Sequence, residues 1–293
     1  MKLRLTAPAK INLFLDVLWK RADGFHNIQS IMQTVSLADT VVLNIADASE
    51  NRITLSCTDP SIPTDSENLA FRAAELYFER FGITGKTLDI FIEKHIPIGA
   101  GLAGGSADAA AVLSGLNKLF GSKAGMLELI DTAVRIGSDV PFCLVGGTKV
   151  TQKRGEDMVS VSPLPDCSIV ICSGNQRIST KWAYEELDRI YNGRFSDRAD
   201  RRARIRSMIH ALNTSDLAGV VTNTYNIFED AVLPLCPEAK ENRDSLLSLG
   251  ADAALMSGSG SAVFGVFRSS EQAQNAKRIL EAPQRRVYLC RPL

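Results

Sequence analysis

The stretch from Pro97 to Ala111, PIGAGLAGGSADAAA, constrains the fold of this 293-residue chain more than any other. It combines four glycines with small residues and a single charge, Asp108. The segment before it, TLDIFIEKHIPI, alternates as a strand does, and SADAAAVLSGLNKLF after it predicts a helix with a small-residue face. Glycines let the backbone approach an anion, and the first N–H groups and the dipole of a helix attract it. The stretch therefore predicts a phosphate-binding loop.

Two other nucleotide-binding patterns fit this loop less well. Gly99, Gly101 and Gly104 match the dinucleotide fingerprint G-x-G-x-x-G, but FGSKAG, about 20 residues on, lacks the acid that would hold a ribose. A Walker A loop would need a lysine before Ser106. An unliganded, tightly packed strand–helix turn remains the structural alternative.

Composition excludes several classes of protein. Lys+Arg and Asp+Glu both number 33, and this zero net charge gives no support to general nucleic-acid binding. The six cysteines form no C-x-x-C pair and the three histidines are scattered, which argues against structural zinc and for thiols in a reducing, cytoplasmic compartment. The N-terminus reads as a strand rather than a signal peptide, and the glycine-rich stretch is too poor in large apolar residues for a membrane span.

The order of expected elements indicates an α+β protein with two domains. Strands within residues 3–18, 40–46 and 52–57 precede a helix capped by Asp65 or Ser66, and a further helix covers about 126–136. We expect IGSDVPFCLVGG to take the chain from that helix into a buried strand. Beyond LPD at 164–166, the pattern β-α-β-β-α-β is typical of a ferredoxin-like domain. We therefore predict domains at 1–160 and 161–293.

Two charged residues could support phosphoryl transfer. Asp139 in GSDVPF could take the proton of an acceptor hydroxyl, although a turn aspartate is the plainer interpretation. Lys10 in APAKINLF is either an edge lysine that reaches solvent or a partner that keeps Asp139 ionised. The sequence alone leaves both pairs of alternatives open.

Three motifs together resemble those of the GHMP kinases: PAKINLFLDV, IPIGAGLAGGSADAA and LMSGSGSAVFG. The additional segments KRADGFHNIQS and IGSDVPFCLVGGT are similar to the members that phosphorylate the 2-hydroxyl of 4-diphosphocytidyl-2-C-methyl-D-erythritol in the non-mevalonate isoprenoid pathway. The resemblance implies a two-domain GHMP kinase fold, with ATP and Mg²⁺ as cofactors. The alternatives are a homoserine or mevalonate type of GHMP kinase, or a nucleotide-binding protein that has lost catalysis, against which the presence of both Lys10 and Asp139 argues.

The resemblance also assigns roles to residues. Asp139 matches the catalytic base and Lys10 its partner, and Asn12 would orient the acceptor. Phe25 and His26 would contact the cytosine, with Tyr184 as the second stacking ring. The ATP-phosphate loop would comprise Pro97, Ile98, Gly99, Ala100, Gly101, Leu102, Ala103, Gly104, Gly105, Ser106 and Ala107.

Further residues have possible roles or stay open between two interpretations. Lys94 and Asn68 could approach the adenosine, and the Ser106 hydroxyl could reach Mg²⁺. Many relatives have Pro where this chain has Ser261, and Tyr where it has Phe25. The basic cluster Arg198–Arg206 is either a solvated helix face or an anion patch. We expect small-molecule substrates, no nucleic-acid or membrane partner, and a monomer or weak homodimer.

Overall fold

The structure is a computed structural model that describes residues 1–153, 155, 157–195 and 199–293. The chain forms two compact units, each assembled from several stretches. Unit one contains residues 1–9, 38–97 and 103–145, and unit two contains residues 10–37, 98–102 and 146–293. The predicted domain boundary after residue 160 stays a prediction.

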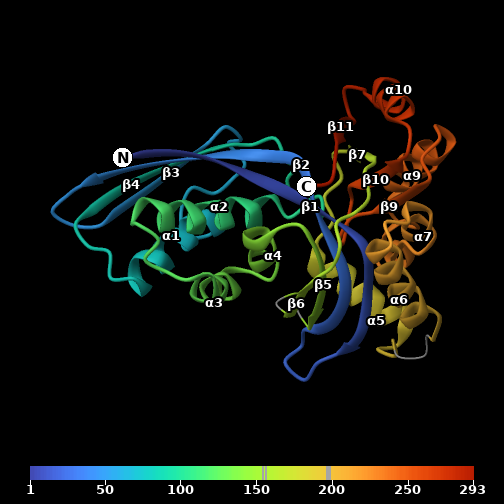
Figure 1. Cartoon of the computed structure of the whole chain (residues 1–293), viewed down its shortest axis with the longest axis horizontal. Helices are drawn as coiled ribbons and strands as arrows, with labels where there is room; N and C mark the ends of the chain where they lie inside the picture. Colours follow the sequence, from blue (N-terminus) through green and yellow to red (C-terminus); the bar gives the residue numbers. More distant parts are fainter. Residues whose placement is uncertain (154, 156, 196–198) are drawn as a thin grey trace. The chain divides into compact units, whose positions relative to one another are not determined.

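Unit one is a sheet with helices on one face (Figure 1). Its strands lie in the order β3-β4-β2-β1, where β3 pairs parallel and β2 antiparallel with β4. The strands are β1 (Lys2–Lys20), β2 (His26–Asp47), β3 (Arg52–Cys57) and β4 (Lys86–Glu93). The helices are α1 (Leu69–Arg80), α2 (Gly104–Leu119), α3 (Met126–Ile136) and α4 (Val140–Val145). The close packing of α1 on α2 is aided by alanines on the buried face of α2.

Three local predictions can be compared with this unit. The helix predicted over 126–136 is confirmed as α3. The cap of α1 is Asn68, whose Oδ1 accepts a hydrogen bond from the Ala70 amide at 2.9 Å, and not Asp65 or Ser66. The buried strand expected within IGSDVPFCLVGG was wrong, because VPFCLV forms the short helix α4 instead. Pro141 is acceptable there, since the first turn of a helix does not need its N–H.

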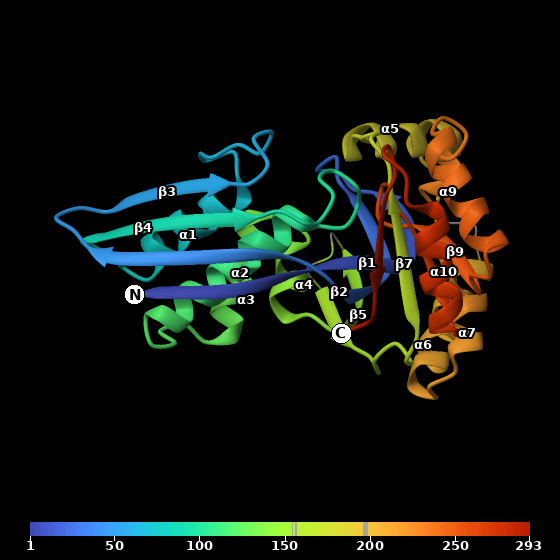
Figure 2. The same cartoon turned by 90° about the horizontal axis from the view of Figure 1, so that it is seen from above.

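The C-terminal part of unit two is a four-stranded antiparallel sheet in the order β11-β7-β10-β9. Its strands are β7 (Ser168–Ser173), β9 (Ala253–Met256), β10 (Val263–Phe267) and β11 (Arg286–Cys290). Figure 2 shows α9 (Pro237–Ser248) and α10 (Ser270–Leu280) together on one side of this sheet. The strand order and the two helices confirm the ferredoxin-like prediction.

The rest of unit two includes the later part of β1 and the first part of β2. From Lys10 onward β1 pairs in parallel with β8 (Tyr225–Asn226). The first half of β2 pairs antiparallel with β5 (Thr148–Lys153), and β5 pairs antiparallel with β6 (Asp157–Ser160). The connection between β7 and β9 contains four helices before α9: α5 (Thr180–Tyr191), α6 (Ala199–Asn213), α7 (Leu217–Thr222) and α8 (Glu229–Val232). Among the described residues, every helix is too short or too polar to cross a lipid bilayer.

Candidate active site

The glycine loop packs backbone against backbone within unit two. Gly99 and Gly101 have φ angles of +66° and +79°, which favour glycine. A Cβ added at Gly101 would lie only 2.0 Å from the carbonyl oxygen of Ser257. The Ser257 hydroxyl donates to the Gly101 carbonyl at 3.0 Å, and the Ala262 amide donates to the Ala100 carbonyl at 3.2 Å. The second and third glycine motifs therefore form one surface.

The third motif, SGSGS between β9 and β10, is held from behind by buried polar groups. The Asn226 amide donates to the carbonyls of Met256 and Gly258 at 2.7 and 2.8 Å. Ser261, which stands where many relatives have proline, is buried, and its hydroxyl donates to the Gln176 carbonyl. The turn thus keeps an ordered set of contacts without the proline.

Lys10 is buried beside both motifs, and so it does not extend from a sheet edge into solvent. The residue is only 4% exposed, and its backbone amide donates to the Leu102 carbonyl at 3.1 Å. The ammonium donates to Asn12 Oδ1 at 2.7 Å, and a Cβ added at Gly258 would lie 3.3 Å from that ammonium. Asn12 in turn donates to the Ser30 hydroxyl at 2.9 Å. The hydrogen-bonded row Lys10–Asn12–Ser30 therefore places a cation next to the glycine motifs.

Asp139 lies in unit one, between α3 and α4. It is half-buried, and its carbonyl accepts a hydrogen bond from the Cys143 amide at 3.0 Å, which starts α4. Because Lys10 lies in unit two, the predicted pairing of Lys10 with Asp139 stays a prediction. The exit of the glycine loop also lies in unit one, where Ala103 caps α2 with a left-handed φ of 58° and Ser106 is half-buried in the first turn.

His26 is fixed by a carboxylate that sequence reasoning missed. His26 Nε2 lies 2.8 Å from Asp188 Oδ1, and Lys20 donates to Asp188 Oδ2 at 2.6 Å. Burial acts to raise the pKa of Asp188, but the hydrogen bonds from Lys20 and His26 outweigh it and hold that pKa below its usual value. An ionised Asp188 can only accept a hydrogen bond, so His26 Nε2 carries a proton, and in the neutral imidazole Nδ1 is then an acceptor.

The two predicted stacking rings have different surroundings. Tyr184 stacks on the His26 ring, with centroids 4.7 Å apart and planes 17° apart, and meets Phe228 edge-on. Phe25 is 51% exposed. The structure therefore brings Tyr184 to His26 and leaves Phe25 with an accessible ring. Phe195, which sequence reasoning did not select, is buried edge-on against His26 at 5.9 Å.

An arginine lies against the glycine loop. The Cγ and Cδ atoms of Arg177 would both be 3.8 Å from a Cβ at Gly99, and the residue is exposed. No pattern in the sequence singles out Arg177, because it stands in an irregular turn before α5. The guanidinium of this side chain is a cation suited to phosphate.

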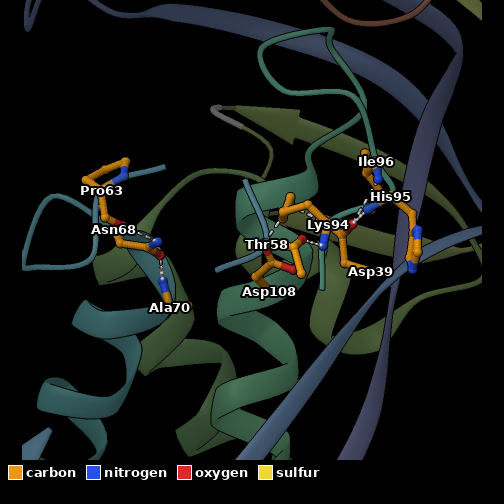
Figure 3. Close-up of polar contacts among 9 residues, drawn as sticks. All are labelled: Asp39, Thr58, Pro63, Asn68, Ala70, Lys94, His95, Ile96 and Asp108. Atoms are coloured by element: carbon orange, nitrogen blue, oxygen red, sulfur yellow. Dashed lines mark hydrogen bonds and ion pairs between the residues drawn. The ribbon is translucent and has the colours of Figure 1, made fainter. Parts of the chain in front are cut away.

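The residues considered for the adenosine side are engaged in the fold (Figure 3). Lys94, at the end of β4, forms ion pairs with Asp39 and Asp108, and the Lys94–Asp108 pair spans 2.8 Å. Asn68 caps α1 and donates to the Pro63 carbonyl at 2.8 Å. Asp108 is the single charge of the glycine-rich stretch, but the sequence predicted neither its pairing with Lys94 nor the part that Asp39 plays.

Arg201 from the basic cluster is not on a solvated face. It is buried and forms an ion pair of 2.5 Å with Asp16, while its guanidinium carbon lies 4.8 Å from the Tyr225 ring centroid. Arg202, Arg204 and Arg206 are exposed on α6, as a solvated face predicts. Arg198 lies outside the described residues.

The residues around the loop fit a magnesium ion that is held mainly through nucleotide phosphates. In the described part of the chain, no group of three or more His, Cys, Asp or Glu side chains could hold a metal by itself. Mg²⁺ usually binds one or two protein ligands and substrate phosphates. Ser106 offers a hydroxyl in the first turn of α2 for this purpose.

Family comparisons match both halves of the chain. The family described as GHMP kinases N terminal domain matches residues 68–147, and the family described as GHMP kinases C terminal matches residues 205–285. The first match contains the glycine loop and Asp139, and the second contains the third glycine motif.

Several full-length relatives share one name, 4-diphosphocytidyl-2-C-methyl-D-erythritol kinase. The protein from Listeria monocytogenes serotype 4b is 39% identical, over 100% of this chain and 96% of its own. The protein from Caldicellulosiruptor saccharolyticus is 42% identical, over 93% of this chain and 90% of its own. A crystal structure of a 4-(cytidine 5'-diphospho)-2C-methyl-D-erythritol kinase is 33% identical with a TM-score of 0.81 and 99% coverage of both chains. A homoserine kinase from Cytophaga hutchinsonii, 22% identical with a TM-score of 0.79 over 98% and 94% of the chains, shares the fold.

Proposed function

The chain belongs to the GHMP kinases, and we propose that it transfers the γ-phosphate of ATP to the 2-hydroxyl of 4-diphosphocytidyl-2-C-methyl-D-erythritol. The products are the 2-phosphate and ADP. The observation that carries this proposal is the site in unit two, where buried Lys10 lies beside Gly258 and the glycine loop. The likeness to full-length relatives of that name supports the choice of acceptor.

The glycine loop would bind the phosphates of ATP. Positive φ angles at Gly99 and Gly101 and the N-terminus of α2 supply backbone N–H groups, and Arg177 adds a side-chain cation. Mg²⁺, when bound with ATP, would neutralise phosphate charge, with Ser106 as its protein hydroxyl. Phosphoryl transfer depends mainly on such positioning and charge stabilisation.

Asp139 would accept the proton of the 2-hydroxyl as that oxygen attacks the γ-phosphorus. Lys10 would hold the carboxylate ionised and stabilise negative charge that develops on the attacking oxygen. Asn12 is bound to the Lys10 ammonium at 2.7 Å and would orient that ammonium toward the acceptor. These roles assign the base, the cation and the orienting group to separate side chains.

The cytidine end of the acceptor would bind at Phe25 and His26. The exposed Phe25 ring can stack on the cytosine, and Tyr184, whose ring stacks on the His26 imidazole, stays the proposed second stacking ring. With Nε2 bound to Asp188, His26 Nδ1 can accept from the 4-amino group of cytosine, which uracil lacks. Homoserine and mevalonate kinases share the fold, but homoserine and mevalonate contain no nucleobase that would bind at Phe25 and His26.

The remaining expectations accompany this proposal. We propose small-molecule substrates, a monomer or weak homodimer, and a reducing cytoplasmic compartment.

The direct test is ADP release from Mg–ATP with three acceptors in parallel. We expect turnover with the cytidyl compound and none with homoserine or mevalonate. Asp139→Asn should lower kcat at least about a hundredfold, because general-base catalysis contributes about 10²–10⁴. Turnover of homoserine or mevalonate instead would overturn the proposed identity of the acceptor. Full activity of Asp139→Asn would overturn the assignment of Asp139 as the general base.

A further inference from the structure

The two chain segments that flank the glycine loop touch each other in unit one. A Cβ added at Gly104, the first residue of α2, would lie 3.1 Å from Ile96 Cγ2 and 3.2 Å from Lys94 Nζ. Both distances are shorter than ordinary contacts of a real Cβ. The segment that enters the loop and the helix that leaves it therefore meet so closely that a Cβ at Gly104 would require Ile96 or Lys94 to move by a few tenths of an ångström.

One buried ammonium joins these two segments (Figure 3). Lys94, just after β4, donates to Asp108 Oδ2 at 2.8 Å in α2 and also to Asp39 in β2. The side chains of Lys94, Asp39 and Asp108 are 6%, 0% and 5% exposed. Asp39 Oδ1 also accepts the amides of His95 and Ile96, at 2.5 and 2.8 Å, immediately before Pro97. The same cluster thus fixes the last residues before the loop and the helix after it.

Burying the charges of this cluster costs more desolvation free energy than a purely structural contact between apolar side chains would. The cluster buries two carboxylates with one ammonium, and apolar residues often stabilise a core as well as a buried ion pair does. Among the described residues, Asp108 Oδ1 has no hydrogen-bond partner. Burial, which outweighs the attraction of Lys94, raises the pKa of Asp108 to about 7. Such a cluster specifies one geometry rather than maximising stability.

We propose that Asp39, Lys94 and Asp108 form a clamp that holds both ends of the ATP-phosphate loop and thereby positions it for ATP. The inference deepens the proposed function and rests on it. The three side chains act through the loop, so they are positioning residues. A loop whose ends are already fixed loses less conformational freedom when the nucleotide binds, and this lowers the KM for ATP.

Asp108→Ala tests the clamp, because it removes the link between α2 and Lys94. We expect the KM for ATP to rise about tenfold, the effect of losing one charge-assisted hydrogen bond, with an unchanged KM for the cytidyl acceptor. Asp108→Asn should recover much of the loss, since its amide oxygen can still accept from Lys94. If Asp108→Ala does not fold, Asp108→Asn carries the test, with an expected rise of about threefold.

Tyr77→Phe is the matched control, because Tyr77 in α1 contacts the other end of α2. The Tyr77 hydroxyl donates to Asn117 Oδ1 at 3.2 Å, so this variant also removes a buried polar link between α2 and its neighbours. We expect a lower Tm for Tyr77→Phe and an unchanged KM for ATP.

Three outcomes are separable. A lower Tm in Asp108→Ala or Asp108→Asn with an unchanged KM for ATP would overturn the clamp and leave a structural role. Equal losses in the Ala and Asn variants, with an altered Mg²⁺ dependence, would overturn it in favour of a metal ligand. Absence of turnover by the unaltered protein would instead be a failure of the proposed function, because then there is no KM to compare.

Discussion

At the scale of single residues, the site depends on polar side chains that other side chains hold. Lys10 is bound by Asn12, His26 by Asp188, and Lys94 by two carboxylates. The sequence could predict Lys10 and His26, because each stands in a distinctive motif. Asp188 could not be predicted, since it lies 162 residues from His26 and an acid on a helix is ordinarily solvated.

The role of Asp188 leads to a prediction about base selectivity. Asp188→Ala should raise the KM for the cytidyl acceptor about tenfold, because His26 loses a charge-assisted hydrogen bond and its fixed tautomer. The KM for ATP should not change. Preference over the uridine analogue of the acceptor should fall as well, and steady-state kinetics with both acceptors measures this.

Glu186→Ala is the control for that variant. Glu186 lies on the same helix, α5, and pairs with Arg189 at 2.6 Å instead of with His26. We expect wild-type KM values for Glu186→Ala. Unchanged selectivity in Asp188→Ala would mean that His26 does not read the base through its tautomer.

At the scale of elements, α2 joins the loop to the core of unit one. The sequence predicts α2 from Ser106 onward, where small helix formers begin, but the helix already starts at Gly104. It does not predict α4, since VPFCLV is a short apolar run that fits a buried strand or a helix equally well. The start of α2 is also where a buried ionisable group makes the fold sensitive to pH.

The pKa of Asp108 predicts how stability depends on pH. The folded pKa of about 7 is above the ordinary value of 3.8, so the native state keeps a proton that the unfolded chain loses. This contribution is fully present below about pH 4 and is lost as pH rises through about 7. Relative to Asp108→Asn, the free energy of unfolding should fall by up to about 1.4 kcal/mol per pH unit in that window.

Denaturant unfolding of both proteins at several pH values measures this difference. The charged groups that face Asp108 are Lys94 and Asp39. The nearby Cys57 thiol also interacts electrostatically with Lys94 and Asp108. Burial lowers the pKa of Lys94, but both carboxylates raise it to a net increase, and burial raises the pKa of Cys57. Both titrate above the window. A difference that does not vary with pH would show that Asp108 is ionised in the folded protein throughout.

At the scale of the whole molecule, the fold brings together three motifs that are far apart in the sequence: the Lys10 motif, the glycine loop and the SGSGS turn. Lys10, Gly101 and Gly258 come together in unit two, although about 90 residues separate Lys10 from Gly101 and about 160 separate Gly101 from Gly258. The ferredoxin-like sheet could be predicted from its element order. The two units could not, because each draws on separate stretches and β1 and β2 contribute to both.

The destination of the γ-phosphate distinguishes a kinase from an ATPase, and phosphorus NMR of a completed reaction identifies it. With Mg–ATP and 4-diphosphocytidyl-2-C-methyl-D-erythritol, we predict one new phosphomonoester signal, unchanged diphosphate signals of the acceptor, and formation of ADP in equal amount. ADP formed together with free phosphate and an unaltered acceptor would contradict the account, because the protein would then hydrolyse ATP without transferring its phosphate.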